Sequence, residues 1–315
     1  VIAANEGAAV GLGAGYYLAT SKCPLIYLQN SGIGNAVNPI LSLLDQDVYR
    51  IPAIFLVGWR GEPGVKDEPQ HVKQGKVTLQ LFDAMGVRNV VMADDEITLN
   101  QQIRDASDYV NISGQPFCFI ARKDTFADYK LREESRENND LTREVALEIV
   151  VRKLDANTVM VSTTGMLSRE LFEIRERNGQ SHSHDFLTVG SMGHASQIAL
   201  GIAMQKRETS VACLDGDGAL LMHMGSLAIV GANAPPNFKH VVFNNGAHDS
   251  VGGQPTVAGF IDLPTIASAC KYRNVYSVNS IPELERILPE FSAGNGPSFL
   301  EIKIKKGARK ELGRP

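Results

Sequence analysis

Two apolar segments of this chain each end in a short run of glycine and polar residues. The first is Cys213-Leu-Asp-Gly-Asp-Gly-Ala219 and the second is Val241-Val-Phe-Asn-Asn-Gly246. The 25 residues from 219 to 243 that separate them leave room for one helix and a return strand. The two segments are therefore expected to be neighbouring parallel strands, and open α/β sheets bind ligands beyond the carboxyl ends of such strands.

This sheet edge would carry the kind of oxygen ligands that Mg²⁺ prefers. Asp217 offers a carboxylate, Asn245 offers an amide oxygen, and the turn after Asn245 offers a backbone carbonyl. Gly216 and Gly218 would let the backbone approach a diphosphate, and a helix starting near Ala219 would point free N–H groups at it. For either half alone, an ordinary Asp-Gly or Asn-Gly turn is the simpler interpretation.

The paired segments resemble the cofactor motif of the thiamine-diphosphate-dependent decarboxylases. In that family the metal is bound by an Asp, by the second Asn and by the carbonyl two residues later, which here are Asp217, Asn245 and Ala247. The resemblance implies thiamine diphosphate and Mg²⁺ as cofactors, with Gly218 and Ala219 at the diphosphate.

The same family needs a glutamate that exchanges a proton with the aminopyrimidine ring of the cofactor. Asn5-Glu6-Gly7 stands at the head of a small-residue helix from Ala8 to Ala19 and resembles that element. The resemblance implies that Glu6 is catalytic and binds the cofactor. A carboxylate that interacts favourably with a helix N-terminus is the structural alternative.

Two further turns follow apolar runs and match the same family. Gly190-Ser191-Met192-Gly193 precedes a helix expected from His194 to Lys206, and Thr163-Thr-Gly165 closes another run. In related decarboxylases the first of these turns accepts a hydrogen bond from the cofactor and wedges an apolar side chain between its rings. The resemblance thus implies cofactor contacts by Gly190, Ser191, Met192 and Thr164. Ordinary strand-to-helix turns with a buried methionine are the alternative.

The remainder of the chain alternates between short apolar runs and longer periodic stretches, which indicates βα units. We expect strands near residues 24–30, 51–59, 90–93, 116–122, 158–164, 185–189, 210–214, 240–245, 275–278 and 298–304. We expect helices near residues 35–44, 76–85, 99–110 and 142–154. The pattern predicts an α/β protein with two doubly wound parallel sheets.

The domain organisation follows from this alternation and from one charged run, Lys130 to Glu137. Residues 1–122 are expected to form a pyrimidine-binding domain without its amino-terminal part, because Glu6 has no strand–helix unit before it and residue 1 is not Met. Residues 123–140 would be a charged linker, and residues 141–315 a diphosphate-binding domain. No central domain fits between them.

Composition narrows the class of protein. The 315 residues are 43% hydrophobic and carry a net charge of −4, which argues against nucleic-acid or membrane binding. The four cysteines are scattered, so neither a disulfide framework nor a zinc site is predicted. Gly11-Leu-Gly-Ala-Gly15 superficially resembles a dinucleotide fingerprint, but it lacks the preceding strand that this fingerprint requires. A cytoplasmic enzyme is expected.

Three segments carry a narrower resemblance, to the phosphonopyruvate decarboxylases and, next, the sulfopyruvate decarboxylases. They are residues 28–35, 58–75 and 244–256. The resemblance implies decarboxylation of 3-phosphonopyruvate to phosphonoacetaldehyde and CO₂ in phosphonate biosynthesis. It also implies a homodimer or higher homo-oligomer with active sites between subunits. A sulfopyruvate decarboxylase, a carboligase resembling acetolactate synthase and a non-enzymatic regulator remain as alternatives.

Candidate substrate contacts lie in these segments. A phosphonate is a compact dianion, so cationic side chains after the second strand are candidate ligands: Arg60, Lys66, His71 and Lys73. Surface salt bridges to Glu62, Asp67 and Glu68 are the alternative for the arginine and lysines. Related decarboxylases place histidines in the matching loop, so the resemblance implies proton transfer by His71, for which imidazole is suited at neutral pH. A structural loop histidine is the alternative. The other candidates are Gln29, Asn30 and Ser31 for the oxo acid, with His248, His182 and His184 as weaker proton donors.

Overall fold

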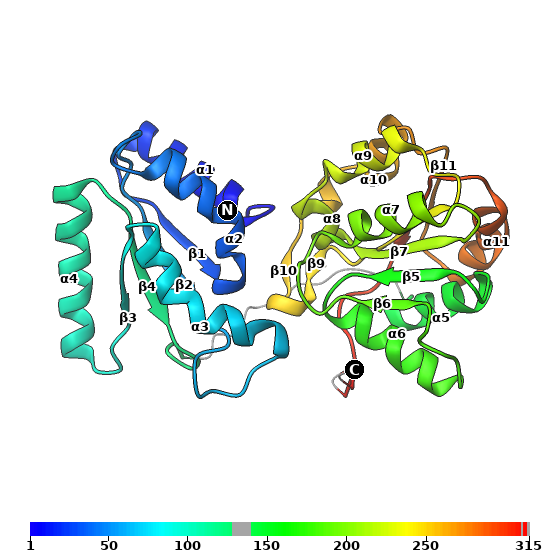
Figure 1. Cartoon of the computed structure of the whole chain (residues 1–315), viewed down its shortest axis with the longest axis horizontal. Helices are drawn as coiled ribbons and strands as arrows, with labels where there is room; N and C mark the ends of the chain where they lie inside the picture. Colours follow the sequence, from blue (N-terminus) through cyan, green and yellow to red (C-terminus); the bar gives the residue numbers. More distant parts are fainter. Residues whose placement is uncertain (128–139, 310, 314–315) are drawn as a thin grey trace. The chain divides into compact units, whose positions relative to one another are not determined.

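The computed structural model describes residues 1–127, 140–309 and 311–313. The chain forms two compact units, residues 1–133 and 134–315 (Figure 1). The expected linker of residues 123–140 falls largely outside the described residues. No helix among the described residues has both the length and the apolar character needed to span a membrane.

The first unit is built on a four-stranded parallel sheet in the order β1-β2-β4-β3. Its strands are β1 (Leu25–Gln29), β2 (Ile54–Gly58), β3 (Arg88–Val91) and β4 (Phe117–Ala121). Its helices are α1 (Glu6–Thr20), α2 (Ile33–Pro39), which continues into a π-helical turn over Ile40–Leu44, α3 (Pro69–Ala84) and α4 (Glu96–Ser113). A short 3₁₀ turn, Asn30–Gly32, joins β1 to α2.

Alternate strand residues of this sheet point to opposite faces and define two cores. Ile26, Phe55 and Cys118 face one core together with buried side chains from α1, α2 and α3. Phe117 and Phe119 face the other core, which α4 covers. Helices therefore lie on both faces of the sheet, which is the doubly wound arrangement.

The second unit is built on a six-stranded parallel sheet in the order β11-β12-β8-β7-β5-β6. The strands are β5 (Val159–Ser162), β6 (Asp185–Leu187), β7 (Val211–Gly216), β8 (Phe238–Asn244), β11 (Asn274–Val278) and β12 (Ser298–Lys303). A short antiparallel pair, β9 (Ala247–His248) and β10 (Gln254–Pro255), lies outside this sheet.

Helices cover both faces of the six-stranded sheet. One core includes buried side chains of α5 (Arg143–Lys153), α6 (Met166–Arg177) and α11 (Ile281–Ala293). The other core includes side chains of α7 (Ala195–Gln205), α8 (Asp217–Met222), α9 (Ser226–Asn233) and α10 (Leu263–Ala269). Two 3₁₀ turns, Asp249–Val251 and Ala258–Phe260, complete the unit. The predicted α/β class with two doubly wound parallel sheets is confirmed.

Capping residues explain where several helices begin and end. The side chain of Asn5 accepts a hydrogen bond from the Ala8 N–H at the start of α1, and Asp95 does the same for Thr98 in α4. Helix α4 ends at Gly114, whose φ of 67° is the left-handed conformation that glycine adopts easily. Capping residues are therefore local signals, from which the end of a helix can be predicted without knowledge of the rest of the fold.

Two expected helix starts differ from the structure. Helix α3 begins at Pro69 rather than near residue 76, because proline is well suited to the first helical position and lacks only an N–H that would be unbonded there. Helix α8 begins at Asp217 rather than near Ala219, and a second helix, α9, also lies between β7 and β8. The earlier start of α3 places His71 and Lys73 on its first turns instead of in a loop.

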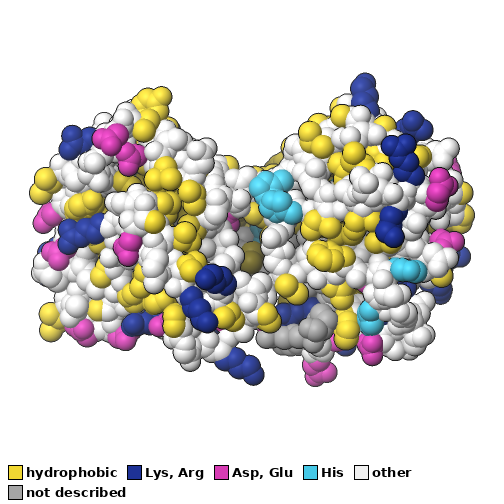
Figure 2. Space-filling model, viewed as in Figure 1, with side chains coloured by type: hydrophobic (Ala, Val, Ile, Leu, Met, Phe, Trp, Pro, Cys, Tyr) yellow, Lys and Arg dark blue, Asp and Glu magenta, His cyan; other side chains and the backbone are white. Residues whose placement is uncertain are grey.

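Figure 2 shows basic, acidic and hydrophobic side chains interspersed over the viewed face of the described residues. This mixed distribution agrees with the modest net charge of −4. A single-sign stripe would be the electrostatic signature of a nucleic-acid-binding surface.

Candidate active site

Two strand ends of the second unit bring Asp217 and Asn245 together. Strands β7 and β8 run parallel, with Gly216 opposite Phe243, so the residues that follow each strand meet at one edge of the sheet. The carboxylate of Asp217 accepts a hydrogen bond from the backbone N–H of Asn245. Both side chains are buried, at 1% and 5% exposure. The expected juxtaposition of the two motif halves is present.

The environment of Asp217 disfavours an uncompensated negative charge. Burial raises the pKa of this carboxyl group to about 6, against the opposing effect of a hydrogen bond from the Thr256 hydroxyl at 2.5 Å. A cation beside the carboxylate would offset the desolvation. Asn245 and Ala247, the other two residues predicted to bind Mg²⁺, line the same cavity as Asp217.

A small cavity of about 60 Å³ lies at this strand edge. Its lining includes the two side chains and residues of the neighbouring turns: Thr163, Thr164, Met192, Gly218, Ala219 and His248. The hydroxyl of Thr163 is buried there and has no hydrogen-bond partner among the described residues. The hydroxyl of Thr164 instead donates to the Val189 carbonyl at 2.8 Å. Of the two threonines, Thr163 therefore has the unsatisfied hydroxyl, and the predicted cofactor contact of Thr164 stays a prediction.

The close packing around Gly218 explains why glycine is needed there. A β-carbon at this position would lie 2.6 Å from Nδ1 of His248, so any side chain here would have to displace the imidazole. Burial lowers the pKa of His248. His248 therefore lies against Gly218, whereas His182 pairs with Glu176 at 2.7 Å and stacks on Phe172.

The turn from Gly190 to Gly193 joins β6 to α7 and packs against α8. Ser191 and Gly193 have φ values of 53° and 87°, so the turn has a left-handed backbone at two positions. A β-carbon on Gly193 would lie 3.0 Å from the Ala219 carbonyl. This packing brings Met192 to the cavity that Asp217 lines.

Two charged residues at the cavity were not among the predicted site residues. Arg143 is buried and pairs with Glu170 at 2.8 Å and with Asp249 at 3.4 Å. Asp249 in turn accepts a hydrogen bond from the side-chain amide of Asn245 at 2.6 Å. The pair therefore orients the Asn245 amide, whose oxygen accepts a hydrogen bond from the Ala247 N–H at 3.0 Å. No motif in the sequence around Arg143 or Asp249 indicates that these residues orient the Asn245 side chain.

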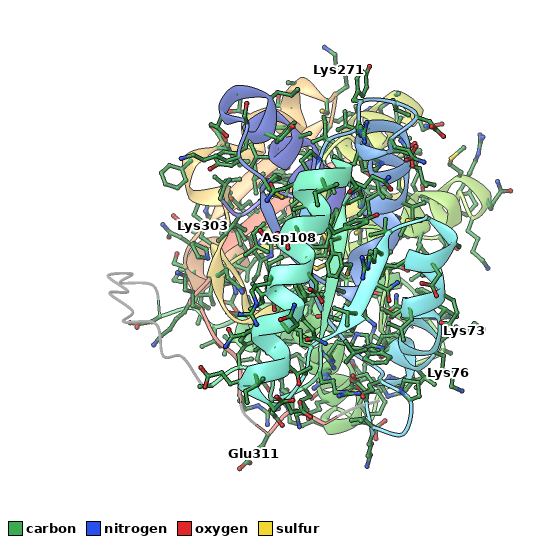
Figure 3. The ribbon with its side chains drawn as sticks, turned by 90° about the vertical axis from the view of Figure 1, so that its left-hand side faces the viewer. Lys73, Lys76, Asp108, Lys271, Lys303 and Glu311 are labelled. Carbon is green, nitrogen blue, oxygen red and sulfur yellow. The ribbon has the colours of Figure 1, made fainter. Side chains whose placement is uncertain are left out.

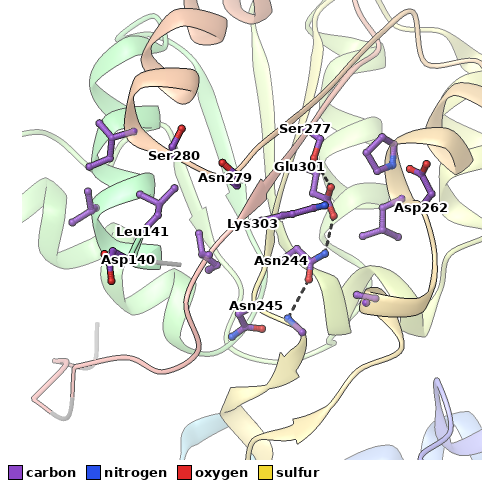
Figure 4. Close-up of a pocket in the computed structure, with 18 of the residues that line it drawn as sticks. Asp140, Leu141, Asn244, Asn245, Asp262, Ser277, Asn279, Ser280, Glu301 and Lys303 are labelled. Carbon is purple, nitrogen blue, oxygen red and sulfur yellow. Dashed lines mark hydrogen bonds between the residues drawn. The ribbon is translucent and has the colours of Figure 1, made fainter. Parts of the chain in front are cut away.

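The turn that carries Asn245 is also braced from a second cavity, of about 1220 Å³ and open to solvent (Figure 4). There the side-chain amide of Asn244 donates to Glu301 at 2.7 Å, and its oxygen accepts from the Gly246 N–H at 3.1 Å. Ser277 holds the other oxygen of Glu301 at 2.7 Å. Both asparagines thus brace the turn through their side chains, but of the two only Asn245 also lines the small cavity with Asp217.

A buried polar network supports the first strand end. Asp215 accepts a hydrogen bond from the Gly216 N–H at 3.0 Å, and its other oxygen lies 3.4 Å from Nε2 of His240. The other ring nitrogen of His240 lies 3.1 Å from the Tyr272 hydroxyl. Because each of these polar groups has a partner, the network stabilises the turn that begins α8.

Glu6 begins α1 in the first unit. Its carboxylate accepts a hydrogen bond from the Asn35 side chain at 2.7 Å. A β-carbon at Gly32 would lie 2.1 Å from the other carboxylate oxygen, so glycine there makes room for Glu6. The two contacts fix the carboxylate at the junction of α1 and α2.

The substrate candidates of the first unit divide into two groups. Gln29, Arg60 and His71 meet in one network through Asp67, which was considered only as a surface ion-pair partner. Asn30 is fully used by the fold, since its side chain bonds to the backbone of Arg60 at 2.7 and 3.0 Å. Ser31 and Lys73 are exposed, and Figure 3 shows Lys73 at the periphery of the unit.

The comparison with protein families covers the part of the chain that forms the small cavity beside Asp217, apart from Arg143. Residues 163–302 match the family model described as the thiamine pyrophosphate enzyme, C-terminal TPP binding domain. This range contains Asp217, Asn245 and the turn with Met192. It supports thiamine diphosphate as the cofactor.

Curated relatives match nearly the whole chain. The phosphonopyruvate decarboxylase of Streptomyces viridochromogenes is 37% identical over 99% of this chain and 80% of its own length. That of Streptomyces hygroscopicus is 37% identical over 99% and 79%. The sulfopyruvate decarboxylase of Methanosarcina acetivorans is 29% identical over 96% and 81%. The chain is thus an enzyme of the carbon–carbon lyase class, and it belongs to the phosphonopyruvate decarboxylase family of thiamine-diphosphate-dependent decarboxylases.

Proposed function

We propose that this protein decarboxylates 3-phosphonopyruvate to phosphonoacetaldehyde and CO₂ as a step in phosphonate biosynthesis. The observation that carries the proposal is the buried oxygen set of Asp217, Asn245 and Ala247, at the edge of a sheet in a chain 37% identical to two phosphonopyruvate decarboxylases. The reaction breaks the bond between the carboxylate and the oxo carbon, and one proton replaces the lost CO₂.

The residues of the second unit would hold the cofactors. Asp217, Asn245 and Ala247 would bind Mg²⁺, and the Thr163 hydroxyl, which has no partner within the described part of the chain, would donate to the diphosphate. Met192 would pack beside the organic part of the cofactor, with the carbonyl of Gly190 as a hydrogen-bond acceptor. Bound thiamine diphosphate supplies the carbon nucleophile and the electron sink of the reaction.

The residues of the first unit would handle protons and the anionic substrate. Glu6 would hold a proton at the aminopyrimidine, since its carboxylate is fixed by Asn35 at 2.7 Å. Arg60 binds Asp67 through Nε and Nη2, which leaves Nη1 outside that ion pair and available to the phosphonate. His71 would transfer the proton that replaces CO₂.

An assay of CO₂ release tests the substrate. The purified protein is given 3-phosphonopyruvate and 3-sulfopyruvate in parallel, with thiamine diphosphate and Mg²⁺ present. We expect kcat/KM for the phosphonate to exceed that for the sulfonate by at least about tenfold, which corresponds to ~1.4 kcal/mol of transition-state binding. The reverse preference would support the alternative function as a sulfopyruvate decarboxylase. The 29% identity to the Methanosarcina acetivorans enzyme is the reason for testing this alternative.

The role of Glu6 is tested by the variant Glu6→Gln. Glutamine keeps the size of the side chain but loses the exchangeable proton site. We expect CO₂ release to fall by at least about 100-fold, the scale of a lost acid–base group. The circular dichroism spectrum and most of the affinity for thiamine diphosphate should be retained. Full turnover in this variant would remove Glu6 from the mechanism.

We also propose that the active protein is a homodimer or higher homo-oligomer. Helix α1 presents Leu12 and Tyr16 at 51% and 46% exposure. A β-carbon on Gly11 or Gly15, on the same helix, would meet nothing within 4 Å. The exposed apolar side chains and the glycines beside them form a helix surface that a second helix can approach closely.

A further inference from the structure

Asp67 is the centre of a network in the first unit that joins three predicted substrate residues. Its Oδ1 lies 3.1 Å from Nδ1 of His71, and Arg60 donates to both of its oxygens, at 2.5 and 2.8 Å. On the opposite side of the ring, Nε2 of His71 lies 3.3 Å from the side-chain nitrogen of Gln29. Asp67 itself was expected only to form surface salt bridges.

The position of Asp67 is determined by its backbone contacts. The N–H groups of Gly61 and Glu68 donate to its two oxygens, each at 2.7 Å. Its side chain is only 12% exposed, and that of His71 only 10%. The carboxylate therefore has a single orientation, and His71 on the first turn of α3 meets it at a fixed angle.

Asp67 is an anion at every pH at which the enzyme would operate. The hydrogen bond from Arg60 is the largest of several effects that hold the pKa of this carboxyl group far below its usual range. Opposing this, burial alone would raise the pKa, but the hydrogen bonds from Arg60, Glu68, His71 and Gly61 outweigh it. A permanent carboxylate can only accept hydrogen bonds.

This requirement selects one tautomer of neutral His71. Because Asp67 only accepts, Nδ1 of the ring must carry the hydrogen, and Nε2 is then left with a lone pair. The side-chain nitrogen of Gln29 only donates, so its contact with Nε2 requires the same tautomer. Reversing the Gln29 amide would instead need a hydrogen on Nε2, which a neutral ring bonded to Asp67 does not have.

We propose that Asp67 is a positioning residue that holds His71 with Nδ1 protonated and Nε2 directed at the end of β1, so that Nε2 carries the transferred proton. The inference rests on the proposed function, because it assigns an atom to the proton step of that reaction. Nε2 first takes a proton from solvent, and Asp67 stabilises the resulting imidazolium without itself becoming protonated. The electron pair of the broken bond to the carboxylate then forms a C–H bond with this proton, and Nε2 regains its lone pair.

The variant Asp67→Asn, in the full-length protein, tests this assignment. Its side chain is the same size, but its NH₂ group must face Arg60, a backbone N–H or His71, where only an acceptor fits. We expect kcat for CO₂ release to fall by about 100-fold, as for a misplaced acid–base group, with a smaller change in KM and unchanged affinity for thiamine diphosphate. Asp67→Glu, which restores the carboxylate on a longer chain, should recover part of kcat.

The tautomer gives a readout that does not depend on activity. Protein labelled with ¹⁵N at histidine is examined by NMR without cofactor, and the signal of His71 is assigned from its loss in His71→Gln. We expect the wild type to show the Nδ1–H form, and Asp67→Asn to lose it. Glu62→Gln is the matched control, because it removes a carboxylate of the same segment that pairs with Arg122 at 2.9 Å and does not touch His71. This control should change neither the tautomer nor kcat.

An Nε2–H tautomer in the wild type would overturn the proposal, even if Asp67→Asn failed to fold. An Asp67→Asn protein that kept both the Nδ1–H tautomer and kcat would also overturn it. If the wild type released CO₂ from neither oxo acid, the proposed function would fail, whereas the tautomer measurement would still decide the role of Asp67.

Discussion

Asp217 is the residue on which cofactor binding depends most directly. It is 1% exposed and, beside the Asn245 backbone, forms the centre of the proposed oxygen set. Asp217→Asn replaces the charged ligand with a neutral one of the same shape. We expect the Mg²⁺-dependent affinity for thiamine diphosphate to fall by at least about 100-fold, since loss of one charge-assisted ligand contact is worth 2–3 kcal/mol. Isothermal titration calorimetry measures this.

The matched control for that variant is Asp155→Asn. Asp155 is an exposed aspartate of the same unit, whose side chain accepts from the Asn157 N–H at 2.7 Å in a surface turn. Its replacement should leave cofactor affinity within a factor of about two. Equal losses in both variants would show that the effect of Asp217→Asn is general destabilisation.

Lys239 makes the stability of the second unit depend on pH. It is 2% exposed on β8, donates to the Gly294 carbonyl and lies 5.7 Å from the centre of the Phe291 ring. Burial lowers its pKa from 10.5 to about 8. Between these values the unfolded chain binds a proton that the folded chain does not, so the free energy of unfolding rises with pH.

The variant Lys239→Met should lack this rise. Between about pH 7.5 and 10, we expect the difference in unfolding free energy between wild type and variant to change by about 2 kcal/mol in favour of the wild type. Denaturant titrations at the two pH values measure it. Lys153→Met, at the exposed end of α5, is the control and should give curves parallel to the wild type. Parallel curves for Lys239→Met would contradict the assigned cause.

The sequence predicts a residue's place most readily where it is encoded in a local run. Asp217 and Asn245 directly follow β7 and β8, and Met192 lies in the turn after β6, so their place at the sheet edge follows from the strands, while their roles stay a prediction. Arg143 and Asp67 were not recognised, because their roles come from partners that the fold brings to them. Arg143 meets Asp249, 106 positions away, and a single sequence contains no signal for that pairing.

At the scale of elements, helix α3 is held against the segment that carries Arg60 and Asp67 by a glycine contact. A β-carbon on Gly75 would lie 1.7 Å from the Gly61 carbonyl. The Trp59 indole also donates to the Gly75 carbonyl, at 2.9 Å. Gly75→Ala must therefore separate the helix from the segment. We expect a loss of about 1–3 kcal/mol in unfolding free energy and a reduced kcat, measured by denaturant titration and CO₂ release.

Gly201→Ala is the control for that variant. Gly201 is an exposed residue within α7, and a β-carbon there would meet nothing within 4 Å. Alanine has a higher helix propensity than glycine, so this variant should be more stable by up to about 1 kcal/mol. A Gly75→Ala protein as stable and active as wild type would show that the close approach of α3 is dispensable.

Strands were easier to predict than helices in this chain. The buried strand β4 (Phe117–Ala121) is an unbroken apolar run, so hydrophobicity alone identifies it. Helices such as α6 and α10 were not identified. Helix α10 has only seven residues, too few for a clear helical period. Helix α6, by contrast, has buried and charged residues at helical spacing, a pattern from which a helix could have been predicted. The start of α3 at Pro69 is encoded by a capping preference rather than by periodicity.

At the scale of the whole molecule, the two compact units divide at residues 133 and 134. The alternation of strands and helices predicted two α/β sheets, because each parallel strand needs a crossover that returns the chain to the same edge. The charged run from Lys130 to Glu137 predicted that the two domains are separated near these residues, because such a run cannot supply a hydrophobic core. The roles of residues 1–122 and 141–315 as pyrimidine- and diphosphate-binding domains remain a prediction.

Assembly is the last property to test, because the active sites implied by the family resemblance lie between subunits. Helix α1 exposes Leu12 and Tyr16 beside Gly11 and Gly15, a surface that would be buried in a homodimer. Leu12→Arg places a charge in that surface, and burying it unpaired would cost several kcal/mol. We expect wild-type protein at micromolar concentration to sediment as a dimer or larger assembly, and Leu12→Arg to sediment as a monomer with greatly reduced CO₂ release. Ile97→Arg, at an 83% exposed position on α4, should change neither property. A monomeric wild type with full activity would place a complete active site within one chain.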